Sequence, residues 1–336
     1  MSIRLVVTLA GVTLAMGAAS CGGELDEVDT RLGAALANVG DGVSPTGTGF
    51  GWLEPEAVPG ESVAAADALG PGADDVLEKS ARIRRTTGFD PASASSAVAL
   101  SGSYALAVLF RDAEPGRLPR LLREAGAMEH PSGEWTLFDL GEPADGRTRG
   151  PLVPFGALVS RIAIGPEGVV LARFEPARAA LIAERGTLAD ESPRLRAAAR
   201  CLGEVAAARM LLATHTYNRP ASPELTAVGL RADGVEVLCA VEGSEEDSER
   251  RRAALEEAFA PDGVDELTGR PISEEIASSE ISAETDGDLH GVRAEIAPAP
   301  GAEPGLLFGA LVRGSVLTYL GVPRPVPPGA SYDLAP

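Results

Sequence analysis

Three cysteines and three histidines are the residues of this 336-residue chain whose types best suit chemistry. A Ser–His–Asp site needs a histidine as its base, so His130, His215 and His290 are the candidates. No Gly-x-Ser-x-Gly motif supplies a nucleophile for any of them. We therefore read the three histidines as surface or turn residues and predict no catalytic residue and no enzyme activity.

Two of the cysteines, Cys201 and Cys239, lie in the body of the chain. No Cys-x-x-Cys motif or nearby histidine supports a metal site around them. Two alternatives remain, a disulfide and a pair of small buried side chains. A disulfide would close a loop of about 38 residues, which the chain-entropy estimate values at roughly 3–4 kcal/mol. It would also place the protein in an oxidising compartment.

Hard oxygen ligands occur at Asp286-Gly287-Asp288, followed by His290. An Asp-Gly pair between two strands is explained as a turn, and the segment has too few ligands for a calcium loop. Carboxylate pairs such as Glu245-Glu246 are adjacent in sequence and are read as solvated charges, not as a glycosidase pair. We predict neither a metal nor a cofactor.

The N-terminus has the layout of a secretory signal. Arg4 precedes an apolar stretch over Leu5–Met16, and small residues follow up to Cys21. The stretch is 12 residues long, whereas a helix needs roughly 20 to cross a bilayer. We therefore predict a cleaved signal peptide over residues 1–20.

Ala18-Ala19-Ser20-Cys21 resembles a bacterial lipobox, although that family usually has leucine where Ala18 stands. The resemblance implies a diacylglycerol and a palmitate on Cys21, which would become the first residue. The alternative is an ordinary signal followed by an incidental cysteine. Each buried acyl CH₂ is worth about 0.8 kcal/mol, so two or three chains would hold the protein on a membrane. The expected location is the extracytoplasmic face of the cell membrane.

The chain carries a net charge of −20, which argues against nucleic acid as a partner. Residues 242–288 hold 16 acidic residues against 4 arginines. We read this segment as a solvated surface that keeps the protein soluble, with weak attraction of divalent cations as the alternative.

Hydrophobic periodicity predicts an α+β body. Predicted helices cover 24–39, 61–69, 73–86, 90–98, 115–125, 176–184, 193–201 and 244–259, and residues 306–311 are predicted to form a short helix or a turn. Predicted strands cover 46–52, 104–110, 135–140, 157–164, 169–174, 205–213, 225–231, 235–241, 278–284, 292–296 and 316–320. Gly165–Gly168, Asp233-Gly234 and Asp286-Gly287 are the predicted hairpin turns.

The predicted elements form a weak repeat, which suggests two similar lobes, each an antiparallel sheet with helices packed on one face. The expected division is a signal peptide over 1–20, an N-terminal lobe over 21–215, a C-terminal lobe over 216–322 and a proline-rich tail over 323–336.

Several short motifs resemble an uncharacterised group of actinobacterial lipoproteins and secreted proteins. They are Gly88-Phe89-Asp90-Pro91, Cys201-Leu202-Gly203, Val237-Leu238-Cys239 and Pro298-Ala299-Pro300-Gly301. That group has no assigned activity, so the resemblance implies a location outside the cytoplasm and supplies no catalytic residue.

Two functional hypotheses follow from the sequence. The first is a membrane-anchored envelope lipoprotein that acts through protein–protein or structural contacts with an unknown envelope protein. The second is a module that binds a small molecule, lipid or peptide in a cleft between the lobes.

Overall fold

The structure is a computed structural model of the whole chain. It describes residues 30–40, 49–58, 67–70, 73–101, 106–141, 150–155, 160–173, 181, 188, 192–212, 222–265, 269–302 and 304–322. Cys21, His215 and the expected tail over 323–336 lie outside these residues.

In the described residues, twelve strands alternate with short helices. The strands are β1 (Gly49–Leu53), β2 (Ser96–Ser101), β3 (Leu106–Arg111), β4 (Met128–Ser132), β5 (Trp135–Asp139), β6 (Arg161–Gly165), β7 (Gly168–Ala172), β8 (Ala207–Leu212), β9 (Leu225–Leu230), β10 (Glu236–Glu242), β11 (Ile276–Asp286) and β12 (Leu289–Pro298). The α-helices are α1 (Arg31–Ala37), α3 (Ala73–Glu78), α4 (Ser80–Thr87), α5 (Leu118–Glu124), α8 (Pro193–Leu202), α9 (Glu245–Ala258), α10 (Leu306–Val312) and α11 (Val316–Tyr319). Short 3₁₀ turns cover η1 (Pro91–Ser93), η3 (Gly150–Phe155) and η5 (Ile272–Glu274).

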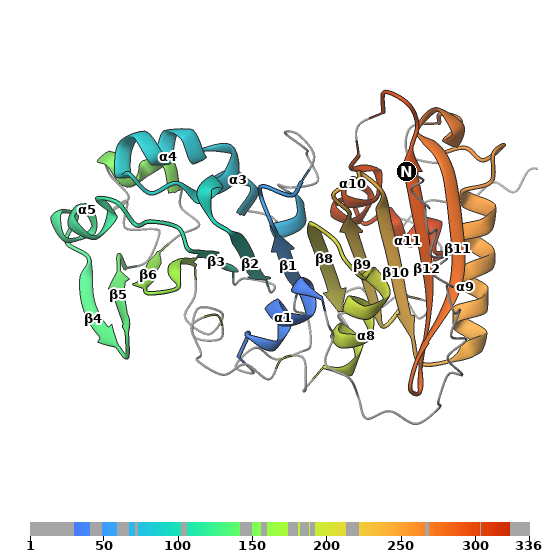
Figure 1. Cartoon of the computed structure of the whole chain (residues 1–336), viewed down its shortest axis with the longest axis horizontal. Coiled ribbons are helices and arrows are strands. Elements are labelled where there is room, and N and C mark those ends of the chain that lie inside the picture. The colour runs from blue at the N-terminus through green and yellow to red at the C-terminus, as the bar shows by residue number, and fades with distance from the viewer. Residues whose placement is uncertain are drawn as a thin grey trace, which may run out of the picture.

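All twelve strands belong to one sheet, in the order β11-β12-β10-β9-β8-β1-β2-β3-β7-β6-β5-β4 (Figure 1). Every neighbouring pair is antiparallel. Strands β1 and β8 pair at the centre, where Gly51 lies opposite Arg209. This pairing joins strands from the two halves of the chain into one continuous sheet.

Both faces of the sheet are covered by apolar side chains. Helices α1 and α8 pack on one face, called here the α8 face, together with Phe50 and Trp52 of β1. Helices α3, α4, α5, α9, α10 and α11 pack on the opposite face, called the α9 face. Figure 1 shows α9 running alongside β11 at one end of the sheet. Large apolar residues on alternate sides of the strands explain how one sheet can bury both of its faces.

The strand order reads alike outward from the central β1–β8 pair. On one side β1, β2, β3 and β7 follow one another, and on the other side β8, β9, β10 and β12 do. Helices α1 and α8 precede the two sets on the same face, while α5 and α9 follow the third strand of each set on the other face. The two halves of the sheet therefore repeat the same order of strands and helices, and both belong to one continuous sheet.

The α+β class and the antiparallel pairing are confirmed, but two separate lobes are not shown. The reason is the β1–β8 ladder, which leaves no gap in hydrogen bonding between the halves. Helices also cover both faces of the sheet, where the sequence predicted one face per lobe.

Two local predictions are wrong. The predicted helix over 90–98 is a 3₁₀ turn capped by Asp90 and followed by β2, which is buried between β1 and β3. The predicted strand over 316–320 is α11, because Val316, Tyr319 and Leu320 fall on one helical face that is buried against the rest of the protein. In both segments tertiary packing overrides local propensity.

Candidate functional site

Of the two alternatives that the sequence leaves open for Cys201 and Cys239, the structure has the disulfide. It joins α8 to β10 on the α8 face, with 6.2 Å between the two Cα atoms. Both residues are buried. The bond therefore fixes the C-terminal end of α8 against the sheet.

A pocket of about 380 Å³ lies next to this fixed end of α8. Its lining combines apolar and charged residues from both halves of the chain: Arg31, Leu202, Glu204, Val205, Ala206, Arg231, Ala232, Asp233 and Arg293. The volume falls within the range of small-molecule sites, about 300–1,000 Å³. We take this pocket as the candidate functional site.

The apolar part of the pocket depends on two glycines. Helix α8 ends at Leu202, and Gly203, at a φ of 67°, turns the chain toward β8. A Cβ atom on Gly229 of β9 would lie only 2.7 Å from Cγ1 of Val205. Glycine at 229 therefore lets Val205 and Leu202 pack closely against the sheet.

Two arginines of the pocket share one carboxylate. Arg231 follows β9, and Arg293 lies on β12. The residues on either side of Arg293, Val292 and Ala294, point to the α9 face, so Arg293 points to the α8 face. One oxygen of Glu295 is 3.3 Å from Arg231 Nη1, and the other is 2.6 Å from Arg293 Nη2. Asp233 adds a second contact to Arg231, at 2.8 Å. Glu295 thus holds two guanidinium groups side by side.

The third arginine comes from the other half of the chain. Arg31, at the start of α1, forms an ion pair with Glu54 and lies 3.6 Å from Glu204. Burial raises the pKa of the Glu54 carboxyl, and the positive charge of Arg31 opposes that rise. The three arginines of the site are thus matched by carboxylates, and the pocket as a whole carries mixed charge.

One polar atom at the pocket is unsatisfied within the described residues. Nε of Arg293 is buried and has no hydrogen-bond partner there. A buried donor without a partner costs about 1–3 kcal/mol. Reorientation of this guanidinium toward an added acceptor would recover part of that cost.

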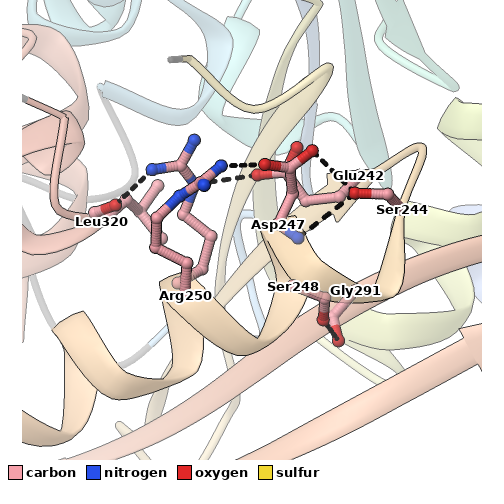
Figure 2. A network of polar contacts seen from close by, with 8 residues as sticks. Glu242, Ser244, Asp247, Ser248, Arg250, Gly291 and Leu320 are labelled. Carbon is pink, nitrogen blue, oxygen red and sulfur yellow. Dashed lines mark hydrogen bonds and ion pairs between the residues drawn. The ribbon is translucent and has the colours of Figure 1, made fainter.

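A separate polar network lies on the α9 face (Figure 2). Arg251 of α9 is 1% exposed; its Nε donates to Glu242 of β10 at 2.8 Å, and its Nη1 donates to the Leu320 carbonyl at 2.7 Å. Ser248 donates to the Gly291 carbonyl at 2.7 Å. These contacts fix α9 to the sheet and to the end of α11, so we assign the network a structural role.

Two further buried acids belong to the same face. Glu236, at the start of β10, accepts hydrogen bonds from the backbone N–H of Leu307. Burial raises the pKa of Glu236 to about 6, although N–H groups of residues 305–308 oppose the rise. The hydroxyl of Tyr319 donates to Asp265 at 2.9 Å, and burial raises the pKa of Tyr319. Neither acid lines the pocket.

The histidines do not form a site in the described part of the chain. His130 is exposed on β4 and His290 is half-buried on β12. The hairpin predicted about Asp286-Gly287 is present: Gly287 and Asp288 form the turn, and Asp286, the last residue of β11, pairs with Arg200 of α8. Among the residues that the structure describes, no group of three His, Cys, Asp or Glu side chains could hold a metal ion.

Comparison with protein-family models, with curated proteins and with solved structures finds no match to this chain. Within the described residues, no helix has the length and apolar character needed to span a membrane. The candidate site therefore has to be interpreted from its own chemistry.

Sequence reasoning missed the pocket. Its three arginines come from distant segments, and in a chain with 29 basic residues none of them is distinctive by type. The one local signal is Gly229, since a glycine inside a strand often marks a close approach of neighbouring atoms.

Proposed function

We propose that the protein is a lipoprotein held on the extracytoplasmic face of a membrane through Cys21, and that it acts through contacts with an envelope protein. The observation that carries the proposal is the disulfide between Cys201 and Cys239, because stable disulfides are typical of proteins outside the cytoplasm. The signal-like segment over residues 1–20 and the lipobox-like end at Cys21 agree with that address. The resemblance to actinobacterial lipoproteins gives the same address.

The acidic surface supports a contact function. The first turn of α9 carries Glu245, Glu246 and Asp247, and the long terminal strand β11 carries exposed Glu280. A strand at the edge of a sheet presents unpaired N–H and C=O groups that a partner strand can use. Charge complementarity mainly sets partner choice and association rate, so the expected partner presents a basic surface.

The two-lobe division over residues 21–215 and 216–322 is part of the same proposal. It is supported by the like order of strands on the two sides of the β1–β8 pair. In this interpretation the two halves arose from one repeated unit and share a single sheet.

The test of the anchor is intact mass spectrometry of the protein extracted from its own membrane. The expected mass is that of a chain beginning at Cys21 with acyl groups attached. Cys21→Ala should abolish acylation and membrane retention, while the control pair Cys201→Ser and Cys239→Ser should leave acylation unchanged. An unacylated chain that still carries residues 1–20 would refute the proposal.

A second candidate function is binding of a small molecule. It is favoured by the pocket of about 380 Å³ at the junction of α1, α8 and β12. The two candidates are compatible, because an anchored protein can both contact a partner and hold a ligand.

A further inference from the structure

We propose that this pocket binds a free α-amino acid with an aliphatic side chain. The proposal rests on the second candidate function and names its class of ligand. Three groups of lining residues match the three parts of such a molecule: Arg231 and Arg293 for the carboxylate, Glu204 and Asp233 for the ammonium group, and Leu202 with Val205 for the side chain.

The carboxylate of the ligand would meet two guanidinium groups that are already positioned. Glu295 takes one N–H donor from Arg231 and one from Arg293, and Asp233 takes one more from Arg231, so each guanidinium keeps further N–H donors. A guanidinium has five N–H donors in a planar fork that suits a carboxylate. The unpartnered Nε of Arg293 adds a donor that gains a hydrogen bond if the side chain turns toward the ligand.

The ammonium group would meet Glu204. This carboxylate lies between α8 and β8, has a side chain 59% exposed, and is 3.6 Å from Arg31. Charge-assisted N–H···O bonds are normally about 2.7–2.9 Å long, so the contact with Arg31 is a loose one. Glu204 therefore keeps acceptor capacity for an ammonium group that enters the pocket.

The aliphatic side chain would meet the apolar lining. Leu202 and Val205 line the pocket from the α8 face and come from the end of α8 and the segment that joins it to β8, whereas the side chain of Ala206 belongs to the opposite face. Burial of apolar surface contributes about 25 cal/mol per Å². An aliphatic ligand therefore gains affinity that glycine or a small inorganic anion does not.

The balance of charge favours a zwitterion over a simple anion. Glu54, Glu204, Asp233 and Glu295 surround the three arginines, so the site has no excess of positive charge. A plain anion would also be repelled by the protein, because the net charge of the chain is −20. A ligand with both charges satisfies arginines and carboxylates together.

The test is a calorimetric titration of the full chain, with its disulfide intact, using alanine, valine and leucine. Leucine is expected to bind more tightly than alanine. Leucinamide, which lacks the carboxylate, and N-acetylleucine, which lacks the ammonium group, should each bind at least about tenfold more weakly than leucine, a loss of about 1.4 kcal/mol. Failure of all three amino acids to bind at about 10 mM would overturn the proposal.

Two variants separate the roles of the lining residues. Arg293→Gln should weaken leucine at least about tenfold. Glu204→Gln should weaken leucine but leave N-acetylleucine unchanged; because Glu204 is exposed, this variant keeps the test valid if Arg293→Gln does not fold. The matched control is Arg120→Gln, which removes an exposed arginine from α5, remote from the pocket lining.

The binding experiments and the mass measurement of the lipid anchor can fail independently of each other. Equal binding of leucine, leucinamide and N-acetylleucine, or leucine binding unchanged in both pocket variants, would overturn the ligand proposal. Neither result would alter the mass of the acylated chain, which tests the lipoprotein proposal separately.

Discussion

The carboxylate of Glu236 in β10 accepts hydrogen bonds from the backbone N–H of Leu307 in α10, at 3.2 and 3.3 Å. The two residues are 71 positions apart in the chain. Glu236 is 3% exposed, so this contact holds a buried charge against the start of a helix. Glu242, at the other end of β10, holds Arg251 of α9 on the same face. The two acids of one strand therefore anchor two helices of the α9 face.

The first prediction concerns pH and Glu236. Its pKa is about 6 in the folded protein, above its ordinary value of 4.5, so the folded state binds the proton more tightly than the unfolded state. Stability contributed by this group is therefore present below about pH 4.5 and is lost as the pH rises through about 6. The loss should amount to about 2 kcal/mol.

Glu236→Gln cannot titrate and serves as the reference. Denaturant unfolding gives the free energy of unfolding of both proteins at about pH 4 and pH 7.5. Subtracting the value of the variant from that of the parent at each pH largely cancels the contributions of the other acidic residues, which the two proteins share. The Gln variant should gain stability relative to the parent as the pH rises. A difference independent of pH would contradict the raised pKa.

The second prediction concerns the buried pair Arg251–Glu242. Arg251→Met leaves a carboxylate buried without its cation, which should lower the free energy of unfolding by about 3–5 kcal/mol. Adding Glu242→Gln removes that charge, so the double variant should recover part of the loss. Chemical denaturation measures both.

The neighbouring Arg250 provides the control. It pairs with Asp247 on the same helix, but its side chain is 51% exposed. Arg250→Gln should cost no more than about 1 kcal/mol. Equal losses at positions 250 and 251 would show that burial of the pair has no energetic consequence.

Turn chemistry made several elements predictable from sequence. The hairpins at Gly165–Gly168, Asp233-Gly234 and Asp286-Gly287 are confirmed, because glycine there provides the backbone conformations that tight turns require. Phe50 and Trp52, within the strand predicted over 46–52, lie on one face of β1, since a strand alternates its side chains.

The elements that sequence reasoning missed lack such local signals. Strand β4 reads Met-Glu-His-Pro-Ser, is exposed throughout and forms the last strand of the sheet, so it shows no apolar alternation. The β1–β8 pairing joins residues far apart in the chain, which no local pattern encodes. The pocket shares this limit, because Arg31, Arg231 and Arg293 meet only after the sheet has formed.

The third prediction concerns the disulfide. The double variant Cys201→Ser with Cys239→Ser should lose roughly 3–4 kcal/mol of stability, because the open chain regains the entropy of a loop of about 38 residues. Thermal unfolding with and without reductant measures the effect. Reductant should destabilise the parent to a similar extent and leave the variant unchanged; a parent insensitive to reductant would argue that the bond does not form in solution.

The last prediction links packing to the pocket through Gly229. A Cβ at this position would lie 2.7 Å from Val205 Cγ1 and 3.2 Å from Leu202 Cδ2, so Gly229→Ala forces both side chains to move. Overpacking of this kind costs about 1–3 kcal/mol. Val205→Ala removes the atom that the new methyl group would strike, so the double variant Gly229→Ala with Val205→Ala should be more stable than the sum of the single effects. Chemical denaturation of the four proteins gives the coupling energy. Strictly additive effects would mean that Gly229 and Val205 do not touch, and that the apolar lining of the pocket is not set by this glycine.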